Sequence, residues 1–327
     1  DRKVPVIWVK FPVQSAMVGH DIGSDGPDSF GSYVVIWTTT PWTIPANQAV
    51  SYNPEISYGE YRVKSVMSEE ELGFPPYARR GDRLIVADSL ASEVMTAAKV
   101  SDFERVRDVN PEALGLSHPL AQMDSFFDKP IPMLAGDHVT DDAGTGFVHT
   151  APAHGEDDFN VWVESGRTTQ EIRQIVDADG CYTPDVPRFG GMDIIRTSGK
   201  KRGEMGKANP EVIAALAESG NLLARGMTTI RDAHSWRSKA PLIFRNTSQW
   251  FISMETNDLR DKALTAIAET RFVPPQGQTR LRSMIENRPD WVLSRQRAWG
   301  VPITVFIHKE TSEVLKDEAV NKRIFDA

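Results

Sequence analysis

Cysteine is almost absent from this sequence, which has one, Cys181, among 327 residues. A single cysteine excludes an intramolecular disulfide and any zinc site built from several cysteines, and it fits a reducing compartment such as the cytoplasm. Long apolar runs are also lacking, because none reaches the ~18 residues that a membrane-spanning helix needs. The first five residues, DRKVP, form neither an initiator methionine nor a secretion signal, so we expect a processed chain or a piece of a longer one.

An excess of positive charge is lacking as well. Lys and Arg number 37 against 45 Asp and Glu, which gives a formal net charge of -8. No global basic field attracts nucleic acid, so any contact with RNA or DNA has to come from local patches. The stretch Ser198–Lys207 is one candidate, and it fits either a solvated loop or a loop that contacts phosphates. Its basic residues include Lys200, Lys201 and Arg202.

The sequence otherwise has the composition of an ordinary globular protein, with 40% hydrophobic and 25% charged residues. At ~100 to 200 residues per domain, its length predicts two domains. The composition changes after Gly226, where tryptophan and arginine become frequent and helical patterns replace strand patterns. We therefore expect one domain over residues 1–226 and a second over residues 227–327.

The first of these domains consists mainly of short segments rich in Val, Ile and Tyr, which predict the strands of a barrel or sandwich. The expected class is α+β, a β-barrel-rich domain with peripheral helices followed by a more helical part. One helix is predicted to have Asn209 as its N-cap and Gly220 just past its end. The predicted strands are Val4–Val9, Tyr33–Trp37, Tyr58–Val66 and Arg83–Ala87. The predicted helices are Asp88–Ala98, Asp157–Glu164, Pro210–Ser219, Asp258–Glu269 and Thr279–Asn287, and Ser68–Asp82 is predicted to be an exposed loop or inserted hairpin.

The segment Trp37–Asn47 (WTTTPWTIPAN) places three consecutive threonines where a strand runs into a proline. Strand pairing stops at Pro41, which has no N–H, and the hydroxyls of Thr38, Thr39 and Thr40 then lie on both faces of the strand end. Such hydroxyls can bind a polar ligand, although threonine is also an ordinary strand residue.

A second segment, residues 144–159 (GTGFVHTAPAHGEDDF), predicts a strand, a sharp turn and then a helix. Asp157 and Asp158 stand in the first helical turn, where a negative charge stabilises the helix by roughly 0.3 to 1 kcal/mol. His149 and His154 fit hydrogen-bonded, partly buried imidazoles. The four side chains also allow a metal site, but a full set of metal ligands is not evident, so we expect none.

The C-terminal third interleaves arginine with tryptophan. The segments are WRSKAPLIFRNTSQWF (236–251), NRPDW (287–291) and SRQRAWG (294–300). Guanidinium groups beside indole rings suit contacts with phosphates and planar bases, and they also hold domains together. The residues alone leave both uses open.

Together and in this order, the segments resemble the class I isoleucyl-tRNA synthetases over about Val4 to Pro302. The resemblance is to the inserted editing domain, CP1, and to the return of the chain into the catalytic domain. Leucyl and valyl members carry a TTRPxT pattern, with arginine where Thr40 stands, and a different residue at His149, so the isoleucyl type fits better. Ser235 stands where some isoleucyl enzymes have a cysteine, so no zinc is expected there. The HIGH and KMSKS signatures of amino-acid activation are missing, since residues 19–23 (GHDIG) do not match the first.

The resemblance implies an aminoacyl-tRNA deacylase that removes valine wrongly attached to isoleucine tRNA. Binding alone discriminates poorly against the loss of one methylene, a limit first drawn for isoleucyl enzymes themselves, whereas a smaller second pocket can exclude isoleucine by size. Editing of this kind needs no cofactor, and only the full-length synthetase would need ATP. The expected partners are the 3' end of isoleucine tRNA carrying valine and the remainder of the synthetase, with no membrane and a monomeric state.

By motif position, Asp158 is implied to bind the α-ammonium group and His149 to limit the side-chain pocket. The threonine strand would offer donors to the ester, the ribose or a water molecule, and Trp42 would close one side. The expected catalytic residues are Asp158, Thr38, Thr39 and Thr40. The expected substrate-binding residues are His149, Trp42, Thr150, Asp157 and His154, of which His154 is also a candidate weak base. The expected tRNA-binding residues are Lys200, Lys201 and Arg202.

Two other functions stay open at this point. One is a tRNA-docking or structural fragment that does no chemistry and holds acceptor ends through Lys200, Lys201, Arg202 and Arg295. The other is an editing domain of leucyl or valyl specificity. A deacylation assay beside a binding assay separates the first, and the mischarged tRNA that is hydrolysed separates the second.

Overall fold

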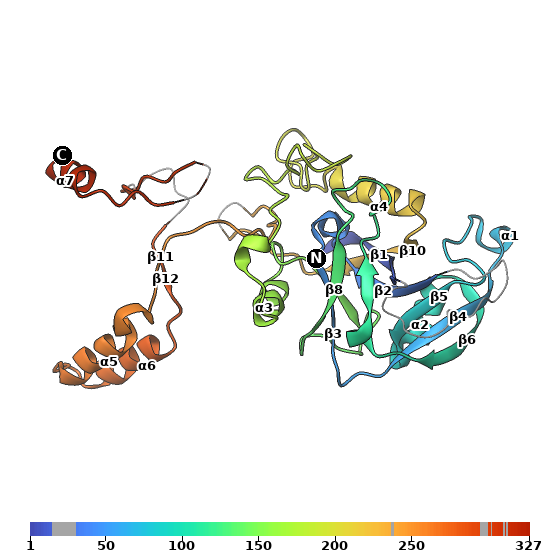
Figure 1. Cartoon of the computed structure of the whole chain (residues 1–327), viewed down its shortest axis with the longest axis horizontal. Coiled ribbons are helices and arrows are strands. Elements are labelled where there is room, and N and C mark those ends of the chain that lie inside the picture. Colours follow the sequence, from blue (N-terminus) through green and yellow to red (C-terminus); the bar gives the residue numbers. More distant parts are fainter. Residues whose placement is uncertain (15–30, 237–238, 295–299, 302, 310, 312) are drawn as a thin grey trace. The chain divides into compact units, whose positions relative to one another are not determined.

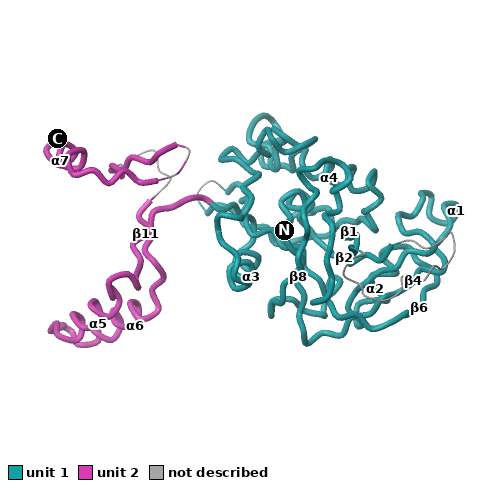
Figure 2. Tube along the Cα trace, in the orientation of Figure 1, with its two compact units in different colours: residues 1–246 teal, residues 247–327 magenta. Residues whose placement is uncertain are grey.

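The computed structural model describes residues 1–14, 31–236, 239–294, 300–301, 303–309, 311 and 313–327 (Figure 1). The chain forms two compact units, residues 1–246 and 247–327, in teal and magenta in Figure 2. The first unit extends beyond residue 226, where the sequence predicted a boundary. Gly226 lies inside strand β10 (Leu222–Ile230) and pairs with Val6, so the chain is still part of the first sheet at this point.

A six-stranded sheet in the first unit contains all four predicted strands. Its strand order is β10-β1-β2-β5-β4-β6. Neighbouring strands are antiparallel except β2 and β5, which run parallel. The β-branched and aromatic residues that predicted these strands are the residues that the sheet buries. The strands are β1 (Arg2–Pro12), β2 (Ser32–Thr38), β4 (Tyr58–Val66), β5 (Arg83–Ala87), β6 (Val100–Asp108) and β10.

A four-stranded sheet, in the order β7-β8-β3-β9, shares a hydrophobic core with the first sheet. The core joins Phe11 and Ile36 of the larger sheet to Val50 and Leu116 of the smaller one. Strand β2 also lies against β9, which brings the end of the threonine strand close to the strand that carries His149. The strands are β3 (Ala49–Tyr52), β7 (Gly115–Ser117), β8 (Pro130–Ala135) and β9 (Phe147–Thr150).

Short helices connect these strands, and the α+β class is confirmed. The sharp turn before β9 needs glycine, because a Cβ on Gly146 would lie 2.4 Å from the Cβ of Ala87. The α-helices of this unit are α1 (Glu69–Leu72), α2 (Ala91–Ala97), α3 (Glu156–Glu164) and α4 (Ala208–Glu218). The 3-10 helices are Pro41–Ala46, Asp88–Leu90, Pro111–Ala113 and Thr169–Glu171.

The predicted excursion Ser68–Asp82 connects the antiparallel strands β4 and β5. It begins with the short helix α1 rather than with a hairpin. Ser68 caps this helix, since its hydroxyl accepts the N–H of Glu71 while the Glu71 carboxylate accepts the N–H of Ser68. This reciprocal pair of hydrogen bonds between Ser68 and Glu71 starts a helix within the segment that was predicted to be a loop.

Helix α4 corrects the predicted cap. It begins at Ala208 after Lys207, and Asn209 lies inside its first turn. The Asn209 side-chain oxygen instead accepts a hydrogen bond from the backbone N–H of Trp42, at 3.1 Å. The predicted stop is confirmed, because Gly220 follows the helix with a φ of 72°, a left-handed conformation that favours glycine. The capping prediction was wrong because a contact with a distant segment uses the amide.

The second unit is mainly helical. The helical patterns around residues 258–269 and 279–287 are confirmed, and the two helices there pack against each other. None of the helices in the described ranges is long and apolar enough to cross a bilayer. The elements are β11 (Phe251–Ile252), a 3-10 helix (Thr256–Asp258), α5 (Leu259–Glu269), α6 (Gln276–Glu286), β12 (Trp291–Val292) and α7 (Glu318–Asp326).

Candidate active site

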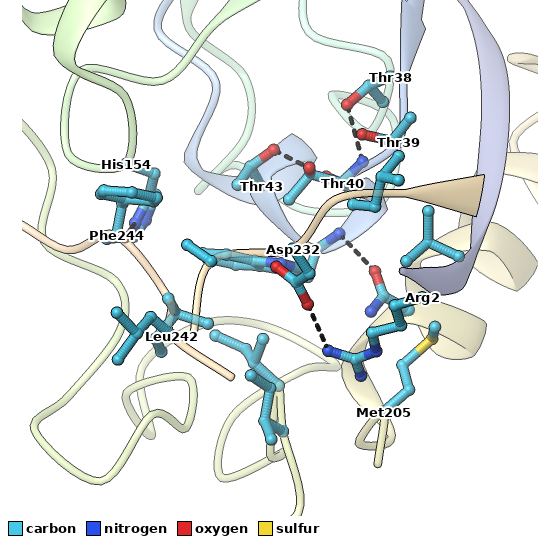
Figure 3. Close-up of a pocket in the computed structure, with 18 of the residues that line it drawn as sticks. Arg2, Thr38, Thr39, Thr40, Thr43, His154, Met205, Asp232, Leu242 and Phe244 are labelled. Atoms are coloured by element: carbon cyan, nitrogen blue, oxygen red, sulfur yellow. Dashed lines mark hydrogen bonds and ion pairs between the residues drawn. The ribbon is translucent and has the colours of Figure 1, made fainter. Parts of the chain in front are cut away.

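A pocket of about 400 Å³ in the first unit gathers most of the predicted site residues (Figure 3). Its wall is built from the end of β2, from β9, from the start of α3 and from residues 230–233 and 242–244. These segments are distant in sequence, and the packing of β2 against β9 brings the first two together. The predicted residues that line the pocket are Thr38, Thr39, Thr40, Trp42, His149, His154 and Asp158.

The threonine strand end is a tight turn with free hydroxyl groups. β2 ends at Thr38, whose Oγ1 accepts the N–H of Thr40 at 3.0 Å. The backbone N–H and the hydroxyl of Thr43 both donate to the carbonyl of Thr40, at 3.0 and 2.8 Å. The hydroxyls of Thr39 and Thr40 make no hydrogen bond with the described residues. This strand end therefore offers donors and acceptors to a polar ligand.

His149, on β9, is buried and bonded through both ring nitrogens. Its Nδ1 lies 2.7 Å from Nδ2 of Asn47, and its Nε2 lies 2.9 Å from Oγ1 of Thr43. The Asn47 amide nitrogen also donates to the carbonyl of Ala49, at 2.8 Å, which sets the orientation of the amide. An amide nitrogen only donates, so Nδ1 of His149 accepts and Nε2 carries the proton. The imidazole is held as a single neutral tautomer.

The electrostatics of His149 agree with this geometry. Burial, with smaller contributions from the neighbouring His118 and His154, lowers its pKa to about 3. The ring is neutral at physiological pH, and its single lone pair is already used by Asn47. An imidazole fixed in this way suits the wall of a pocket better than a base that accepts a proton.

Asp158 provides an unpaired carboxylate in the same pocket. It lies in the first turn of α3, and its Oδ2 accepts the backbone N–H of Ala151 at 2.8 Å. Within the described part of the chain, no Lys, Arg or His forms an ion pair with it. Burial raises the pKa of Asp158, and the Ala151 hydrogen bond opposes this shift only in part. A bound cation would favour the charged carboxylate, so this end of the pocket is suited to an ammonium group.

His154 and Trp42 form another side of the pocket. Their rings meet edge to face, with centroids 4.9 Å apart. The His154 Nδ1 donates to the carbonyl of Phe244 at 2.9 Å, which ties the segment 242–244 to the pocket wall. Burial lowers the pKa of His154, and its Nε2 is enclosed without a hydrogen-bond partner among the described residues. The neutral ring therefore keeps an unused acceptor.

Two of the predicted substrate-binding residues do not line the pocket. Thr150 is buried on the opposite face of β9 from His149, where its hydroxyl lies 2.7 Å from that of Ser51. Asp157 is exposed on the first turn of α3, one position before Asp158. Side chains at adjacent positions on a strand or helix point in different directions. The pocket therefore receives His149 but not Thr150, and Asp158 but not Asp157.

The basic residues Lys200, Lys201 and Arg202 are exposed in a loop and do not line this pocket either. Arg202 lines a neighbouring cavity of about 230 Å³ together with Arg196. Their role in binding tRNA stays a prediction. Arg295 and the segment 19–23 lie outside the described residues.

Sequence reasoning missed several residues of the site. Thr43 and Asn47 lie in the threonine motif, but nothing in the motif indicated that both would hold His149. Arg2 and Asp232 form an ion pair at 2.9 Å in the pocket lining, as the dashed line in Figure 3 shows. These residues are 230 positions apart, so only the pairing of β1 with β10 brings them together.

No cluster of three or more potential metal ligands occurs among the residues that the structure describes. The polar groups of the pocket include the carboxylate of Asp158, the neutral imidazole of His149 and the hydroxyls of the threonine strand end. Such a set can bind a cation, a branched apolar group and a polar carbonyl at the same time.

A comparison with known families accounts for most of the chain. The family model described as "tRNA synthetases class I (I, L, M and V)" matches residues 31–326. The chain belongs to the class I tRNA synthetases.

Curated relatives of this class I synthetase chain carry the name isoleucine–tRNA ligase. The protein of Caulobacter vibrioides is 52% identical over 334 residues, which cover 100% of this chain and 33% of that protein. The protein of Brucella abortus is 51% identical over 348 residues, covering 100% of this chain and 34% of that protein. The chain thus spans about a third of the length of the curated relatives that it matches.

Among solved structures, this synthetase chain has a partial likeness to leucyl-tRNA synthetase editing domains. The editing domain of the P. falciparum cytosolic leucyl-tRNA synthetase aligns with 11% identity and a TM-score of 0.34, covering 47% of this chain and 63% of that one. The editing domain of the P. knowlesi cytosolic enzyme aligns with 12% identity and a TM-score of 0.35, covering 48% of this chain and 61% of that one.

Proposed function

We propose that this chain is the editing part of an isoleucyl-tRNA synthetase and hydrolyses the ester of valine mischarged onto isoleucine tRNA. The observation that carries the proposal is the pocket in which the threonine strand end, the fixed ring of His149 and the unpaired carboxylate of Asp158 meet. The family and the isoleucyl relatives support the synthetase assignment. Cytoplasmic location and a monomeric state remain predictions.

Each part of a valyl ester has a partner in this pocket. The α-ammonium group pairs with Asp158, which forms no ion pair with any of the described residues. The branched side chain packs against the imidazole of His149, which Asn47 and Thr43 prevent from turning aside. The ester carbonyl and the ribose hydroxyls face the threonine strand end, where Thr39 and Thr40 have free hydroxyls.

Hydrolysis then requires one correctly placed water molecule. The water oxygen attacks the ester carbonyl carbon, the bond from that carbon to the ribose oxygen breaks, and the proton from water ends on the ribose oxygen. A neighbouring ribose hydroxyl already activates the ester, so orientation by an ion pair and by fixed hydroxyl donors supplies most of what the reaction needs. No protein nucleophile and no metal ion is part of this mechanism.

Selectivity follows from the rigid wall. Isoleucine has one methylene more than valine, and a ring that is hydrogen-bonded on both sides cannot move to admit it without breaking those bonds. Overlap between atoms in a closed pocket costs more free energy than a missing contact in an open one. The same pocket accepts valine because its smaller side chain avoids the overlap.

The carboxylate provides the direct test. Replacing Asp158 by Asn removes the negative charge and keeps the size of the side chain, so we expect deacylation of valyl isoleucine tRNA to fall at least about a hundredfold. Release of radiolabelled valine measures the rate. Glu156→Gln is the matched control, because Glu156 is exposed on the same helical turn and its loss changes the helix dipole interaction equally. Full activity of Asp158→Asn would remove this carboxylate from the mechanism.

Chelation tests the metal-free mechanism. After exhaustive treatment with EDTA and removal of the chelate, we expect the rate of valine release to stay within about twofold of the untreated protein, because no metal ligand takes part. Loss of activity that returns on addition of zinc would contradict the mechanism.

The docking alternative has one observation in its favour, the exposed basic loop with Lys200, Lys201 and Arg202. A fragment that only docks would bind isoleucine tRNA and release no valine. Measuring binding and deacylation side by side separates the two functions. Offering leucine and valine tRNAs, each mischarged, tests the remaining specificities.

A further inference from the structure

The pocket contains four formally charged side chains, and two of them neutralise each other. The charged residues in its lining are Arg2, Arg231, Asp158 and Asp232. Arg2 and Asp232 form an ion pair, with Nη1 2.9 Å from Oδ2. The two histidines of the lining carry no charge at neutral pH, since burial lowers the pKa of both.

Asp158 and Arg231 are the two charged residues of the lining that are not used in an ion pair. Neither forms an ion pair with any residue in the described ranges, and they do not pair with each other. Arg231 directly follows the last residue of β10 and its side chain is exposed. One pocket thus presents an unpaired carboxylate and an unpaired guanidinium group. Its charges complement a ligand that carries one cationic and one anionic group.

The substrate of the proposed function has these two charges. Its cation is the α-ammonium group of valine, and its nearest anion is the phosphate on the 5' side of the terminal adenosine. We propose that Arg231 binds this phosphate while Asp158 binds the ammonium group. This inference rests on the proposed function, and it adds a residue that orients the nucleotide end of the substrate.

Arg231 fits this role better than the other basic residues of the unit. The guanidinium group of Arg2 is already engaged by Asp232, and Lys200, Lys201 and Arg202 do not line the pocket. A guanidinium group presents paired N–H donors that match two phosphate oxygens, a geometry that lysine lacks. Two charge contacts at different points of the lining also fix the direction of the substrate, which one contact cannot do.

Two non-hydrolysable ligands test the contact. The first is 3'-(L-valyl)amino-3'-deoxyadenosine, in which an amide replaces the ester, and the second is the same compound with a 5'-phosphate. Calorimetric titration of the 327-residue chain measures both dissociation constants at low ionic strength. We expect the phosphate to tighten binding about two- to fivefold, as for an exposed ion pair, and the gain to shrink as salt is added.

Substitutions then identify the residue that binds the phosphate. In Arg231→Ala the ratio of the two dissociation constants should fall to about one, and Arg231→Lys should retain part of it. Arg80→Ala is the matched control, because Arg80 is also an exposed arginine of the first unit but does not line the pocket. It should keep the ratio of the unaltered chain. Circular dichroism at each step verifies that the variants are folded.

The outcomes separate this inference from the proposed function. Equal binding of the two ligands by the unaltered chain, or a ratio that survives Arg231→Ala, would overturn the role of Arg231 while the pocket still binds the valyl group. Failure of both ligands to bind would instead refute the proposed function. Valyl adenylate is a different ligand, because its phosphate lies between the valyl group and the ribose. Slower hydrolysis of this compound by Arg231→Ala, with an unchanged ratio of the two dissociation constants, would also overturn the assignment.

Discussion

At the scale of single residues, the ring of His149 is held in place by hydrogen bonds on both sides. Asn47 is hydrogen-bonded to one ring nitrogen and Thr43 to the other, and the Thr43 hydroxyl in turn donates to the carbonyl of Thr40. A wall held at both ends is rigid because any rotation breaks a buried hydrogen bond, and each such break costs about 1 to 3 kcal/mol. We therefore expect size selection in this pocket to depend on this one ring.

Removing the ring should abolish the selection. In His149→Ala we expect hydrolysis of correctly charged isoleucyl tRNA to appear, so that the preference for valine falls about tenfold or more, because the additional methylene now has space. Rates with the two esters, measured side by side, give the preference. His234→Ala is the control, since this exposed histidine lies outside the pocket lining. A preference that survives His149→Ala would place the wall elsewhere.

Buried histidines also make stability depend on pH. Burial lowers the pKa of His118 to about 4 and that of His149 to about 3, against about 6.5 in an unfolded chain. The unfolded state therefore binds more protons below pH 6.5, and the free energy of unfolding decreases as the pH falls toward the folded values. Between pH 6.5 and 5.5 the two residues together should cost about 2 kcal/mol.

Denaturant unfolding at the two pH values measures this difference, and His118→Gln should reduce it by about half. The side-chain amide of this variant can still donate to the carbonyl that His118 contacts, that of Ile44. The difference in pH dependence between the two proteins is then due to one ionisable group. An identical dependence in both would show that the pKa of His118 is the same in the folded and the unfolded state.

The motifs predicted some residues of the pocket lining correctly and placed others there wrongly. Asp158 and His149 were identified by their place in motifs, and the pocket contains both. Thr150 and Asp157 were included because they stand beside them, yet the period of a strand and that of a helix direct adjacent side chains apart. Asn47 could not be predicted as a partner of His149, because their contact spans 102 positions and depends on the pairing of β3 with β9.

At the scale of elements, the end of α4 depends on backbone conformation alone. Gly220 has a φ of 72°, and a Cβ built on it meets no atom within 4 Å. Gly220→Ala should therefore lower the free energy of unfolding by about 1 kcal/mol through strain in the left-handed conformation and not through a clash. Gly31→Ala is the matched control, because it also has open space but no left-handed φ. Equal effects in the two variants would contradict this explanation.

Local patterns predicted the elements whose own residues carry a clear signal. The four predicted strands of the six-stranded sheet are runs rich in β-forming residues, and Gly220 is a local stop signal. The short strands β3 and β7, of four and three residues, have too few positions for a period to be visible. Asn209 had the sequence of a cap, but a tertiary hydrogen bond to Trp42 took its side chain. Elements defined by tertiary contacts are those that the sequence alone did not predict.

At the scale of the whole molecule, the pocket belongs to one compact unit. Every residue of its lining lies within residues 1–246. The change in composition after Gly226 predicted an earlier boundary, but composition reports the residues of a segment and not the strand with which it pairs. Residues 227–230 pair with residues 2–5 of β1, and Asp232 and Phe244 complete the wall of the pocket.

Two truncated chains test where the unit ends. A chain of residues 1–246 keeps every strand pair of the first sheet and the whole pocket lining, so we expect it to unfold in one transition and to bind the valyl amide ligand. A chain of residues 1–226 loses four residue pairs between β1 and β10 and the partner of Arg2. At about 2 to 4 °C per kcal/mol, we expect its melting temperature in calorimetry to be at least about 5 °C lower. Equal melting temperatures would mean that residues 227–246 do not stabilise the unit, and that the boundary inferred from composition is the physical one.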